Sequence, residues 1–306
     1  MIYRTLGRTG QRVSVVGVGT WQFGGEWGRG YIPTDAAAIL AAAREVGINL
    51  IDTAECYGDH LAEKLIGETL PGARGDWVIA TKWGHKFHRC FERDHCFGPA
   101  DLLAQLDASL KALRTDHVDL LQFHSGDDAD FATEGMWEAA AKAKAQGKVR
   151  FLGNSIGSNA NIKQTDASDA VGVDVIQVIY NCLQREPEAE VFPSCLRQNL
   201  GVLARVPLAS GFLSGKYKPG HVWSATDVRE VWMKEGRDEL LAGVEKIAAT
   251  EVPAGVPMAA WALAWCLRHP AVTAVIPGCK DPEQVRANAA AALLDPALLN
   301  HPLAVL

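Results

Sequence analysis

The sequence has few cysteines, no long apolar run and no cluster of basic residues. Its 306 residues include seven cysteines, an odd number spread thinly over the chain, which does not fit a disulfide framework. No apolar run approaches the roughly 20 residues of a membrane-spanning helix, and residues 1–17 lack the apolar region of a signal peptide. The net charge of −6 argues against nucleic acid and anionic membranes as partners. We therefore expect a cytoplasmic protein with reduced cysteines.

The composition is that of an ordinary globular protein. Hydrophobic residues make up 48% of the chain and charged residues 22%, which is enough to bury a large core. The length alone allows two domains, but α/β barrels of this size commonly form one. Because no linker or low-complexity segment interrupts the chain, we predict a single domain over residues 1–306.

Short apolar runs of the kind found in buried parallel strands recur along the whole chain. Helical patterns separate most of them. The runs are VVGVGTW (15–21), INLIDTA (48–54), WVIATKW (77–83), VDLLQFH (118–124), VRFLGNS (149–155), DVIQVIYN (174–181), GVLARVP (201–207) and VTAVIPG (272–278). They predict eight strands.

The alternation of strand and helix predicts a (β/α)8 TIM barrel. Segments 33–47 and 98–116 begin near a proline and repeat apolar residues on one face, as helices do. Residues 224–250 add further helical material before a last barrel helix. The Gly-flanked turn in YRTLGRTGQRVSVVG predicts an N-terminal β-hairpin at the barrel bottom. The doubly wound nucleotide-binding fold also alternates, but GVGTWQFGG lacks its G-x-G-x-x-G spacing.

Three polar residues stand at the ends of consecutive predicted strands. Asp52 ends the second, Lys82 the third and His124 the fourth. In a barrel the functional site lies at these carboxyl ends, and parallel neighbours are about 4.8 Å apart. A buried carboxylate is costly without a partner, and Lys82 supplies one for Asp52.

Tyr57 follows Asp52 closely enough to fold over the same barrel mouth. A neighbouring lysine is expected to lower its pKa from about 10, which suits a general acid. His124 can then hold a substrate oxygen against the tyrosine hydroxyl. Such an array protonates a developing alkoxide and so requires a hydride donor. An isolated Asp–Lys pair is more often structural than catalytic, but the convergence of four such residues favours catalysis.

These motifs resemble those of the aldo-keto reductase family, of the bacterial type, nearly end to end. The similar stretches are YRTLGRTGQRVSVVGVGTWQFGG, NLIDTAECYG, VIATKWG, DLLQFHS, IQVIYN, VPLASGFLSGKY and AVIPGCKDPEQVRAN. The resemblance implies a catalytic tetrad of Asp52, Tyr57, Lys82 and His124, with Tyr57 as proton donor. It also implies that NAD(P)H binds extended across the barrel mouth.

The resemblance assigns cofactor contacts along the chain. Residues 19–21 would lie under the nicotinamide, segment 207–216 would wrap the pyrophosphate, and Lys280 would neutralise a 2′-phosphate, which favours NADP with NAD as the alternative. The implied cofactor residues are Gly19, Thr20, Trp21, Asp52, Asn154, Ser155, Gln177, Arg205, Pro207, Leu208, Ser210, Gly211, Leu213, Lys216, Gly278, Lys280, Gln284 and Asn288.

Two positions depart from the family pattern. Ile156 stands where an amide-binding Asn is usual, so the carboxamide would depend on Asn154 or on Gln177. Arg205 stands where many members stack a tyrosine on the nicotinamide. A planar guanidinium can also stack, but it adds positive charge near the ring.

The substrate pocket is predicted to include Trp21, Tyr57, Trp83, Phe87 and His124. The loop after the third strand holds His88, Cys90, His95 and Cys96, whose spacing does not match a zinc finger. A substrate-facing loop without a metal is the preferred interpretation, and a Cys90–Cys96 disulfide is an alternative in oxidising surroundings. Cys56 would be reactive if exposed and inert if buried.

Together these features predict an NADP-dependent reductase of aldehydes or ketones. The alternatives are a sugar or polyol dehydrogenase that works oxidatively with NAD, and a non-catalytic NADPH-binding subunit such as the β-subunits of potassium channels. The expected partner is a small carbonyl or alcohol substrate, with neither nucleic acid nor membrane. The sequence predicts neither the particular substrate nor the oligomeric state.

Overall fold

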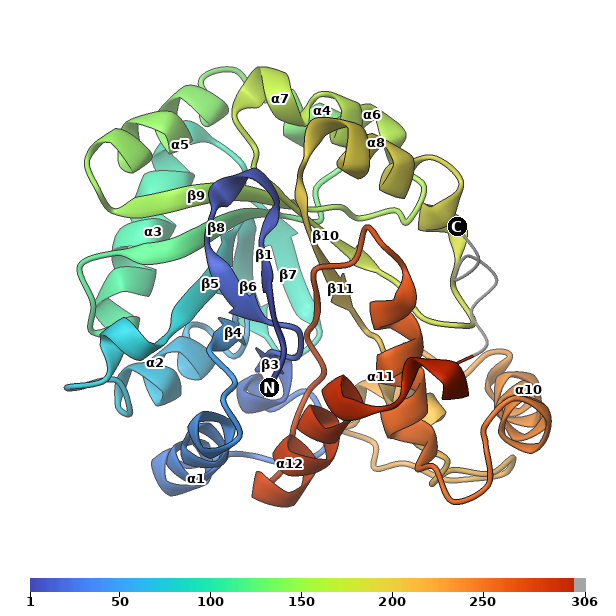
Figure 1. Cartoon of the computed structure of the whole chain (residues 1–306). Helices are drawn as coiled ribbons and strands as arrows, with labels where there is room; N and C mark the ends of the chain where they lie inside the picture. The colour runs from blue at the N-terminus through green and yellow to red at the C-terminus, as the bar shows by residue number, and fades with distance from the viewer. Residues whose placement is uncertain (300–306) are drawn as a thin grey trace.

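Eight parallel strands form the centre of the molecule in the computed structural model, which describes residues 1–299 (Figure 1). Their order around the sheet is β12-β11-β10-β9-β8-β5-β4-β3. The strands are β3 (Val18–Gly19), β4 (Leu50–Asp52), β5 (Val78–Trp83), β8 (Val118–His124), β9 (Val149–Ser155), β10 (Val175–Ile179), β11 (Gly201–Arg205) and β12 (Ala274–Val275). The amide of Val275 donates to the Val15 carbonyl at 2.9 Å, and that of Gly19 to the Pro277 carbonyl at 2.9 Å. These bonds close the sheet, and the predicted barrel fold is confirmed.

The barrel strands are buried on both faces, which explains their continuous apolar sequences. Every residue of β5 and β8 is buried. Alternate side chains point into the barrel, where they form an inner core separate from the larger core under the helices. The inner core contains Leu6, Val13, Leu50, Val78, Ala80, Leu120, Val175, Leu203, Ala274 and Ile276.

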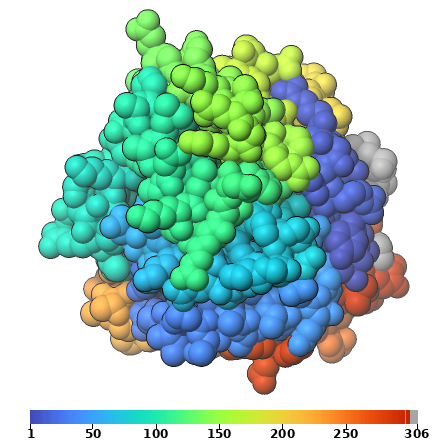
Figure 2. Space-filling view, turned by 90° about the vertical axis from the view of Figure 1, so that its left-hand side faces the viewer, coloured from blue at the N-terminus to red at the C-terminus, as the bar shows by residue number. Residues whose placement is uncertain are grey.

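Helices cover the outside of the barrel, and Figure 2 shows one flank as a continuous surface. The predicted helices over residues 33–47 and 98–116 are present as α1 (Pro33–Glu45) and α3 (Pro99–Leu113). The helical material predicted over residues 224–250 is present as α9 (Val228–Val231) and α10 (Arg237–Thr250). The helices are α1 (Pro33–Glu45), α2 (Leu61–Gly67), α3 (Pro99–Leu113), α4 (Asp128–Phe131), α5 (Met136–Ala145), α6 (Ile162–Asp166), α7 (Ser168–Val171), α8 (Val191–Gln198), α9 (Val228–Val231), α10 (Arg237–Thr250), α11 (Met258–Arg268) and α12 (Pro282–Ala290). Within residues 1–299 none of them is both long and apolar enough to cross a bilayer.

The predicted N-terminal hairpin lies across the amino-terminal end of the barrel (Figure 1). It consists of β1 (Tyr3–Thr5) and β2 (Arg12–Ser14), which pair antiparallel. Leu6 and Val13 enter the inner core, and Arg4 donates to the Val272 carbonyl at 2.6 Å. The hairpin therefore closes this end and leaves the opposite end for a site.

A second hairpin, β6 (His85–Arg89) and β7 (Glu92–His95), follows β5. The sequence predicted only a loop here, because its residues alternate charged and aromatic types without a clear apolar face. Cys90 is exposed, Cys96 is half-buried, and both are free thiols. The alternative of a disulfide between them is therefore not found.

Gly67 at the end of α2 permits close contact with α3. A Cβ at this position would lie 2.3 Å from the Ala112 carbonyl oxygen. We expect Gly67→Ala to lower the free energy of unfolding by about 1–3 kcal/mol, because backbone must move to make room. Gly243→Ala in α10 is the control, since its Cβ would meet nothing within 4 Å and alanine favours a helix by roughly 0.5–1 kcal/mol. Urea unfolding measures both, and equal stability of the two variants would contradict this packing argument.

Candidate active site

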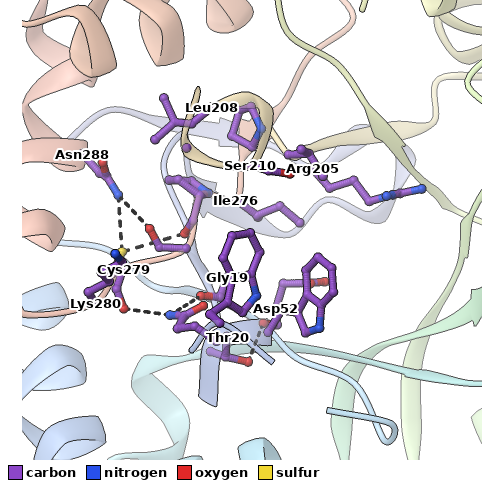
Figure 3. A pocket seen from close by; sticks show the side chains of 18 of the residues that line it. Gly19, Thr20, Asp52, Arg205, Leu208, Ser210, Ile276, Cys279, Lys280 and Asn288 are labelled. Atoms are coloured by element: carbon purple, nitrogen blue, oxygen red, sulfur yellow. Dashed lines mark hydrogen bonds between the residues drawn. The ribbon is translucent and has the colours of Figure 1, made fainter. Parts of the chain in front are cut away.

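A cavity of about 610 Å³ opens at the carboxyl-terminal end of the barrel (Figure 3). This volume is typical of small-molecule and cofactor sites. Most of the residues predicted from the sequence line it, from strands that are far apart in the chain. The predicted residues in its wall are Gly19, Thr20, Trp21, Asp52, Tyr57, His124, Ser155, Gln177, Arg205, Pro207, Leu208, Ser210, Gly211, Lys216, Gly278, Lys280, Gln284 and Asn288.

A buried ion pair between Asp52 and Lys82 lies at the floor of this cavity. The Lys82 ammonium donates to Asp52 Oδ1 at 2.7 Å and to the Thr53 carbonyl at 2.7 Å. Asp52 Oδ2 accepts from the amides of Gln177 at 2.7 Å and Gln122 at 3.1 Å. Each charge is thus satisfied by several partners, which a buried pair requires. The neighbouring carboxylate raises the pKa of Lys82 although burial opposes it, so the lysine stays cationic.

Gln122 is a site residue that the sequence analysis missed. It holds the Asp52 carboxylate and accepts a hydrogen bond from Gln177 Nε2 at 3.1 Å. The signal was present, because Gln122 precedes His124 by two positions in β8. Residues two apart in a strand point to the same side of the sheet.

Tyr57 stands beside the lysine but titrates differently from the prediction. Its hydroxyl accepts a hydrogen bond from Lys82 Nζ at 3.3 Å. Burial nevertheless raises the pKa of Tyr57 to about 12, because desolvation outweighs the attraction of the lysine. The predicted lowering is wrong, and Tyr57 holds its proton at neutral pH. Trp21 stacks near it, with ring centroids 6.2 Å apart.

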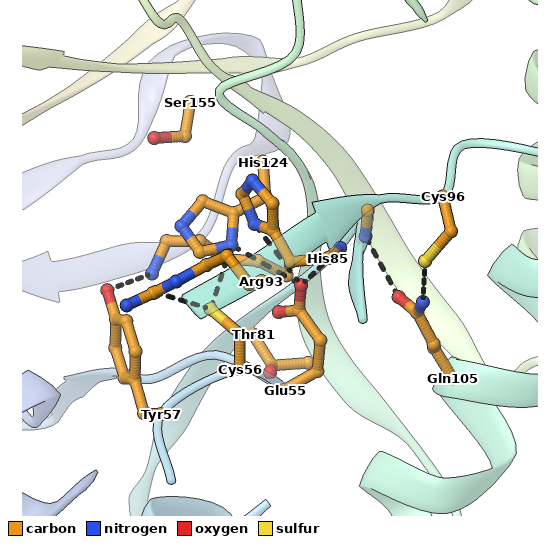
Figure 4. Close-up of polar contacts among 12 residues, drawn as sticks. Glu55, Cys56, Tyr57, Thr81, His85, Arg93, Cys96, Gln105, His124 and Ser155 are labelled. Carbon is orange, nitrogen blue, oxygen red and sulfur yellow. Dashed lines mark hydrogen bonds and ion pairs between the residues drawn. The ribbon is translucent and has the colours of Figure 1, made fainter. Parts of the chain in front are cut away.

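His124 faces Tyr57 edge-on, with ring centroids 6.1 Å apart. Burial holds the pKa of His124 well below its usual range, and the charge of Lys82 acts in the same direction. Its Nδ1 lies 3.4 Å from Glu55 Oε1 and 3.7 Å from Cys56 Sγ (Figure 4). The imidazole is therefore neutral at physiological pH, and only one of its nitrogens carries a proton.

The segment after β11 has an unusual backbone. Val206, Ala209, Ser210 and Gly211 all have positive φ values, of 53°, 46°, 58° and 89°. For β-branched Val206 this conformation is strained, at a cost of about 1–3 kcal/mol. The Ala209 and Gly211 amides donate within the segment, to the Val206 and Leu208 carbonyls at 2.9 Å each, and left-handed residues can direct the remaining backbone N–H groups toward an anion. The segment therefore suits a phosphate group.

The amino terminus of α12 forms the far end of the cavity. Asp281 caps the helix by accepting from the Gln284 amide at 2.8 Å, and Gln284 Oε1 accepts from the Lys280 amide at 2.9 Å. Asn288 donates to Cys279 Sγ at 3.4 Å. The Lys280 side chain is exposed, so its ammonium is available to an anion at this end.

Glu26 ties the β6–β7 hairpin to the cavity wall. It is fully buried and accepts from Trp21 Nε1 at 2.6 Å, from Arg93 Nη2 at 2.7 Å and from the Phe91 amide at 2.8 Å. Arg93 also contacts Cys56 Sγ at 3.3 Å and lies over the Trp232 ring. Trp21, Arg93 and Trp232 all line the cavity. The charged run of the hairpin was the only sequence signal for this network.

Asn154 and Leu213 do not line the cavity, contrary to the prediction. Ser155 and Asn154 point to opposite faces of β9, as successive strand residues must. Ser155 faces the cavity, where it donates to Gln177 Oε1 at 3.3 Å, while Asn154 donates outward to Gln164 of α6 at 3.1 Å. Leu213 is fully buried in the outer core.

Two predicted substrate residues also lie elsewhere. Trp83 is fully buried and packs edge-to-face on Phe123 and Trp137, because it points outward from β5 toward the helices. Phe87 on β6 is half-buried and outside the cavity wall. The hairpin instead contributes His85 and Arg93 to the cavity.

The histidines and cysteines of the hairpin do not converge on one point. His88 pairs with Asp94 at 2.8 Å, His95 with Asp130 at 2.8 Å, and Cys96 with Gln105 at 2.8 Å. Cys56 is fully buried, and burial raises the pKa of its thiol well above the usual value. The burial of Cys56 agrees with the alternative that its thiol is shielded from solvent reagents.

Comparisons with a family model, with related sequences and with solved structures all point to the same protein family. The model described as "Aldo/keto reductase family" matches residues 15–298. A protein of Oryza sativa subsp. japonica named "Probable voltage-gated potassium channel subunit beta" is 31% identical over 303 residues, which cover 94% of this chain and 90% of that protein. The holo form of aldo-keto reductase AKR11C1 from Bacillus halodurans superposes with a TM-score of 0.81 at 30% identity, over 97% of this chain and 92% of that one. The glycerol dehydrogenase AKR11B4 from Gluconobacter oxydans superposes with a TM-score of 0.78 at 28% sequence identity. The match covers 91% of this chain and 86% of that one.

Asp52→Asn tests the buried ion pair. We expect the free energy of unfolding to fall by roughly 3–5 kcal/mol, because the variant leaves the Lys82 ammonium without a counter-charge in the protein interior. The control is Asp76→Asn, which breaks a surface ion pair with Arg44. That pair is 2.6 Å long, close to the 2.7 Å of the buried pair, and both of its side chains are about half exposed. Asp76→Asn should lower the free energy of unfolding by less than about 1 kcal/mol. Chemical unfolding of both variants measures the difference, and similar losses would argue against a special role for the buried pair.

Proposed function

Because the chain belongs to the aldo/keto reductase family of NAD(P)H-dependent oxidoreductases, we propose that it reduces the carbonyl group of an aldehyde or ketone with NADPH. Tyr57 is the proton donor in this proposal. The observation that carries it is the position of the Tyr57 hydroxyl, 3.3 Å from the Lys82 ammonium and next to the His124 ring, in the wall of a cavity of about 610 Å³.

The residues around the cavity fit a bound dinucleotide. The left-handed segment 206–211 suits the pyrophosphate, and Lys216 in the same wall adds a positive charge. Lys280 at the far end suits a 2′-phosphate, which NADP carries and NAD lacks. The side-chain amide of Gln177 and the hydroxyl of Ser155 line the cavity and are the groups that would meet the nicotinamide carboxamide. In the protein alone, Gln177 Nε2 donates to Asp52 and Gln177 Oε1 accepts from Ser155. When bound, NADPH would supply a hydride to the carbonyl carbon.

The protein residues then complete the reduction. As the carbonyl oxygen gains negative charge, Tyr57 transfers its proton to that oxygen, and the Lys82 ammonium stabilises the phenolate that remains. With a pKa of about 12, the tyrosine keeps its proton at neutral pH and releases it only to a strongly basic alkoxide. His124 orients the oxygen by donating a hydrogen bond. General acid catalysis of this kind typically contributes about 10²–10⁴-fold.

Positive charge around the nicotinamide position supports the reductive direction. Arg205 is half-buried in the cavity wall and donates to the Ile156 carbonyl at 3.2 Å. The oxidised nicotinamide ring is a cation, whereas the reduced ring is neutral. The Lys82 charge is balanced by Asp52, so the Arg205 guanidinium is the group that would disfavour the oxidised cofactor relative to NADPH.

Similarity to a glycerol dehydrogenase keeps an oxidative polyol dehydrogenase as the second candidate. Similarity to a protein named as a channel β-subunit raises the further candidate of a regulatory NADPH-binding protein. The complete set of Asp52, Tyr57, Lys82 and His124 supports an enzyme over a purely regulatory protein. Cofactor preference separates the two enzymatic candidates.

Titration of the purified protein with NADPH and with NADH is the direct test of the cofactor. Trp21, Trp27 and Trp232 line the cavity, so binding should quench tryptophan fluorescence. Much tighter binding of NADPH supports the reductase. Equal or tighter binding of NADH supports the polyol dehydrogenase, and binding of neither contradicts the cofactor assignment.

Tyr57→Phe should abolish most turnover while NADPH still binds. The variant removes only the hydroxyl, so we expect kcat for carbonyl reduction to fall by about 10²–10⁴-fold. Tyr3→Phe is the matched control, because the Tyr3 hydroxyl bonds the Gly47 carbonyl at the barrel bottom, far from the cavity. Near-normal turnover in Tyr57→Phe would exclude this residue as the proton donor.

Lys280→Ala should weaken NADPH binding by about 10–100-fold, because it removes a charged hydrogen bond to the 2′-phosphate. NADH binding should change by less than about twofold. Lys216→Ala serves as the comparison, since loss of a pyrophosphate contact should weaken both cofactors alike. Fluorescence titration of both variants measures the effect, and equal losses of NADPH and NADH affinity in Lys280→Ala would mean that Lys280 does not read the 2′-phosphate.

A further inference from the structure

His124 belongs to a group of four residues of metal-binding type whose side chains meet at the cavity wall (Figure 4). Glu55 and Cys56 come from the loop after β4, His85 begins β6, and His124 ends β8. One ligand atom from each lies within 4.8 Å of the others. Glu55 is 2% exposed, Cys56 is fully buried, and the two histidines are each 9% exposed. These residues are separate from the hairpin histidines and cysteines that the sequence singled out.

Three ligand–ligand distances in the cluster fall in the range of tetrahedral coordination, and the four ligand atoms all lie within 4.8 Å of one another. With Zn–N, Zn–O and Zn–S bonds of about 2.0–2.3 Å, ligand atoms at tetrahedral corners stand roughly 3.3–3.8 Å apart. His124 Nδ1 lies 3.4 Å from Glu55 Oε1 and 3.7 Å from Cys56 Sγ. His85 Nδ1 lies 3.7 Å from Glu55 Oε1. The cluster therefore needs little rearrangement to surround a cation.

Two polar atoms of the cluster have no hydrogen-bond partner within residues 1–299. They are Glu55 Oε2 and His85 Nδ1, and both are buried. Buried polar atoms of this kind are nearly always bonded to protein, water or an ion. Glu55 Oε1 already accepts from the His85 amide at 3.0 Å, so Glu55 Oε2 and His85 Nδ1 are the atoms of the cluster that are free to bind a cation.

We propose that Glu55, Cys56, His85 and His124 bind one divalent cation of borderline softness, for which Zn²⁺ is the best fit. The mixed nitrogen, sulfur and oxygen ligands select Zn²⁺ over Mg²⁺ or Ca²⁺, which prefer oxygen alone. The Glu55 carboxylate and a Cys56 thiolate together neutralise the two positive charges. The thiol proton of Cys56 is released to solvent as the Zn–S bond forms.

The surroundings modulate this site in two ways. Arg93 Nη1 donates to Cys56 Sγ at 3.3 Å and so supports the thiolate. The positive charges of Arg93 and Lys82 also repel a cation, so the affinity should be lower than in a purely structural zinc site.

The cation lies on the Nδ1 side of His124. Coordination there leaves the ring proton on Nε2, the tautomer able to donate from the other side of the ring.

The test is a titration of the full-length protein, stripped of metal with a chelator, with Co²⁺ as a spectroscopic probe. We expect one Co²⁺ per chain, intense visible absorption of tetrahedral cobalt and a thiolate-to-cobalt charge-transfer band in the near ultraviolet. Zn²⁺ should displace the cobalt and remove both signals. Absence of the charge-transfer band at millimolar Co²⁺ would overturn the proposal. The readout does not depend on reductase activity, so it is independent of the proposed function.

Cobalt titration of single-residue variants tests whether these four residues are the metal ligands. Cys56→Ser should remove the charge-transfer band, and His85→Gln should keep that band while weakening Co²⁺ binding at least about tenfold. Cys90→Ser and His88→Gln, in the same hairpin, are the matched controls and should bind Co²⁺ normally. Binding that is lost in the controls but kept in Cys56→Ser would place the metal in the hairpin and overturn the proposal.

A measurement on the unaltered protein guards against variants that fail to fold. Crystals soaked in Zn²⁺ and measured at the zinc absorption edge should show an anomalous peak within bonding distance of Cys56 Sγ and His124 Nδ1. A peak only at other positions, or none, would overturn the proposal.

Discussion

The buried ion pair between Lys82 and Asp52 is the interaction on which the rest of the site depends. Two charges in the protein interior are tolerated only when both are paired and hydrogen-bonded. Asp52 has amide donors from Gln122 and Gln177, and Lys82 also reaches a backbone carbonyl and the Tyr57 hydroxyl. These partners come from strands around half of the barrel. The pair therefore fixes the positions of the residues at the cavity floor, and it places the Lys82 ammonium next to Tyr57.

Burial decides how the side chains around this pair titrate. A lysine beside a tyrosine would lower the pKa of the phenol in water, but desolvation raises the pKa of Tyr57 to about 12. The same effect keeps His124 neutral and lowers the pKa of His85 to about 3. The site thus combines one firmly cationic lysine with neutral donors. This combination suits proton transfer to an alkoxide, and neutral imidazoles are also the form that binds metals.

The two ends of the barrel have different roles. The hairpin of β1 and β2 fills the amino-terminal end with Leu6 and Val13, and it adds stability. The carboxyl-terminal end carries loops with strained or irregular backbone, such as Val206 with a φ of 53°. Strain of this kind persists only where the surrounding structure holds it, and it concentrates at binding sites. The β6–β7 hairpin extends the wall of the cavity at this end through Glu26, Arg93 and Trp21.

The sequence by itself determined the eight strands, the hairpin, the barrel and the positions of Asp52, Tyr57, Lys82 and His124, because buried strands and their polar ends have local signatures. Only the tertiary structure decided which side chains share the cavity. Strand alternation turned Asn154 and Trp83 outward, and it placed Gln122 beside Asp52. The meeting of Glu55, Cys56 and His85 with His124 also had no sequence signal, since these residues come from three separate elements. Burial, which sets the pKa of Tyr57, is a property of the packed molecule and not of its neighbours in the chain.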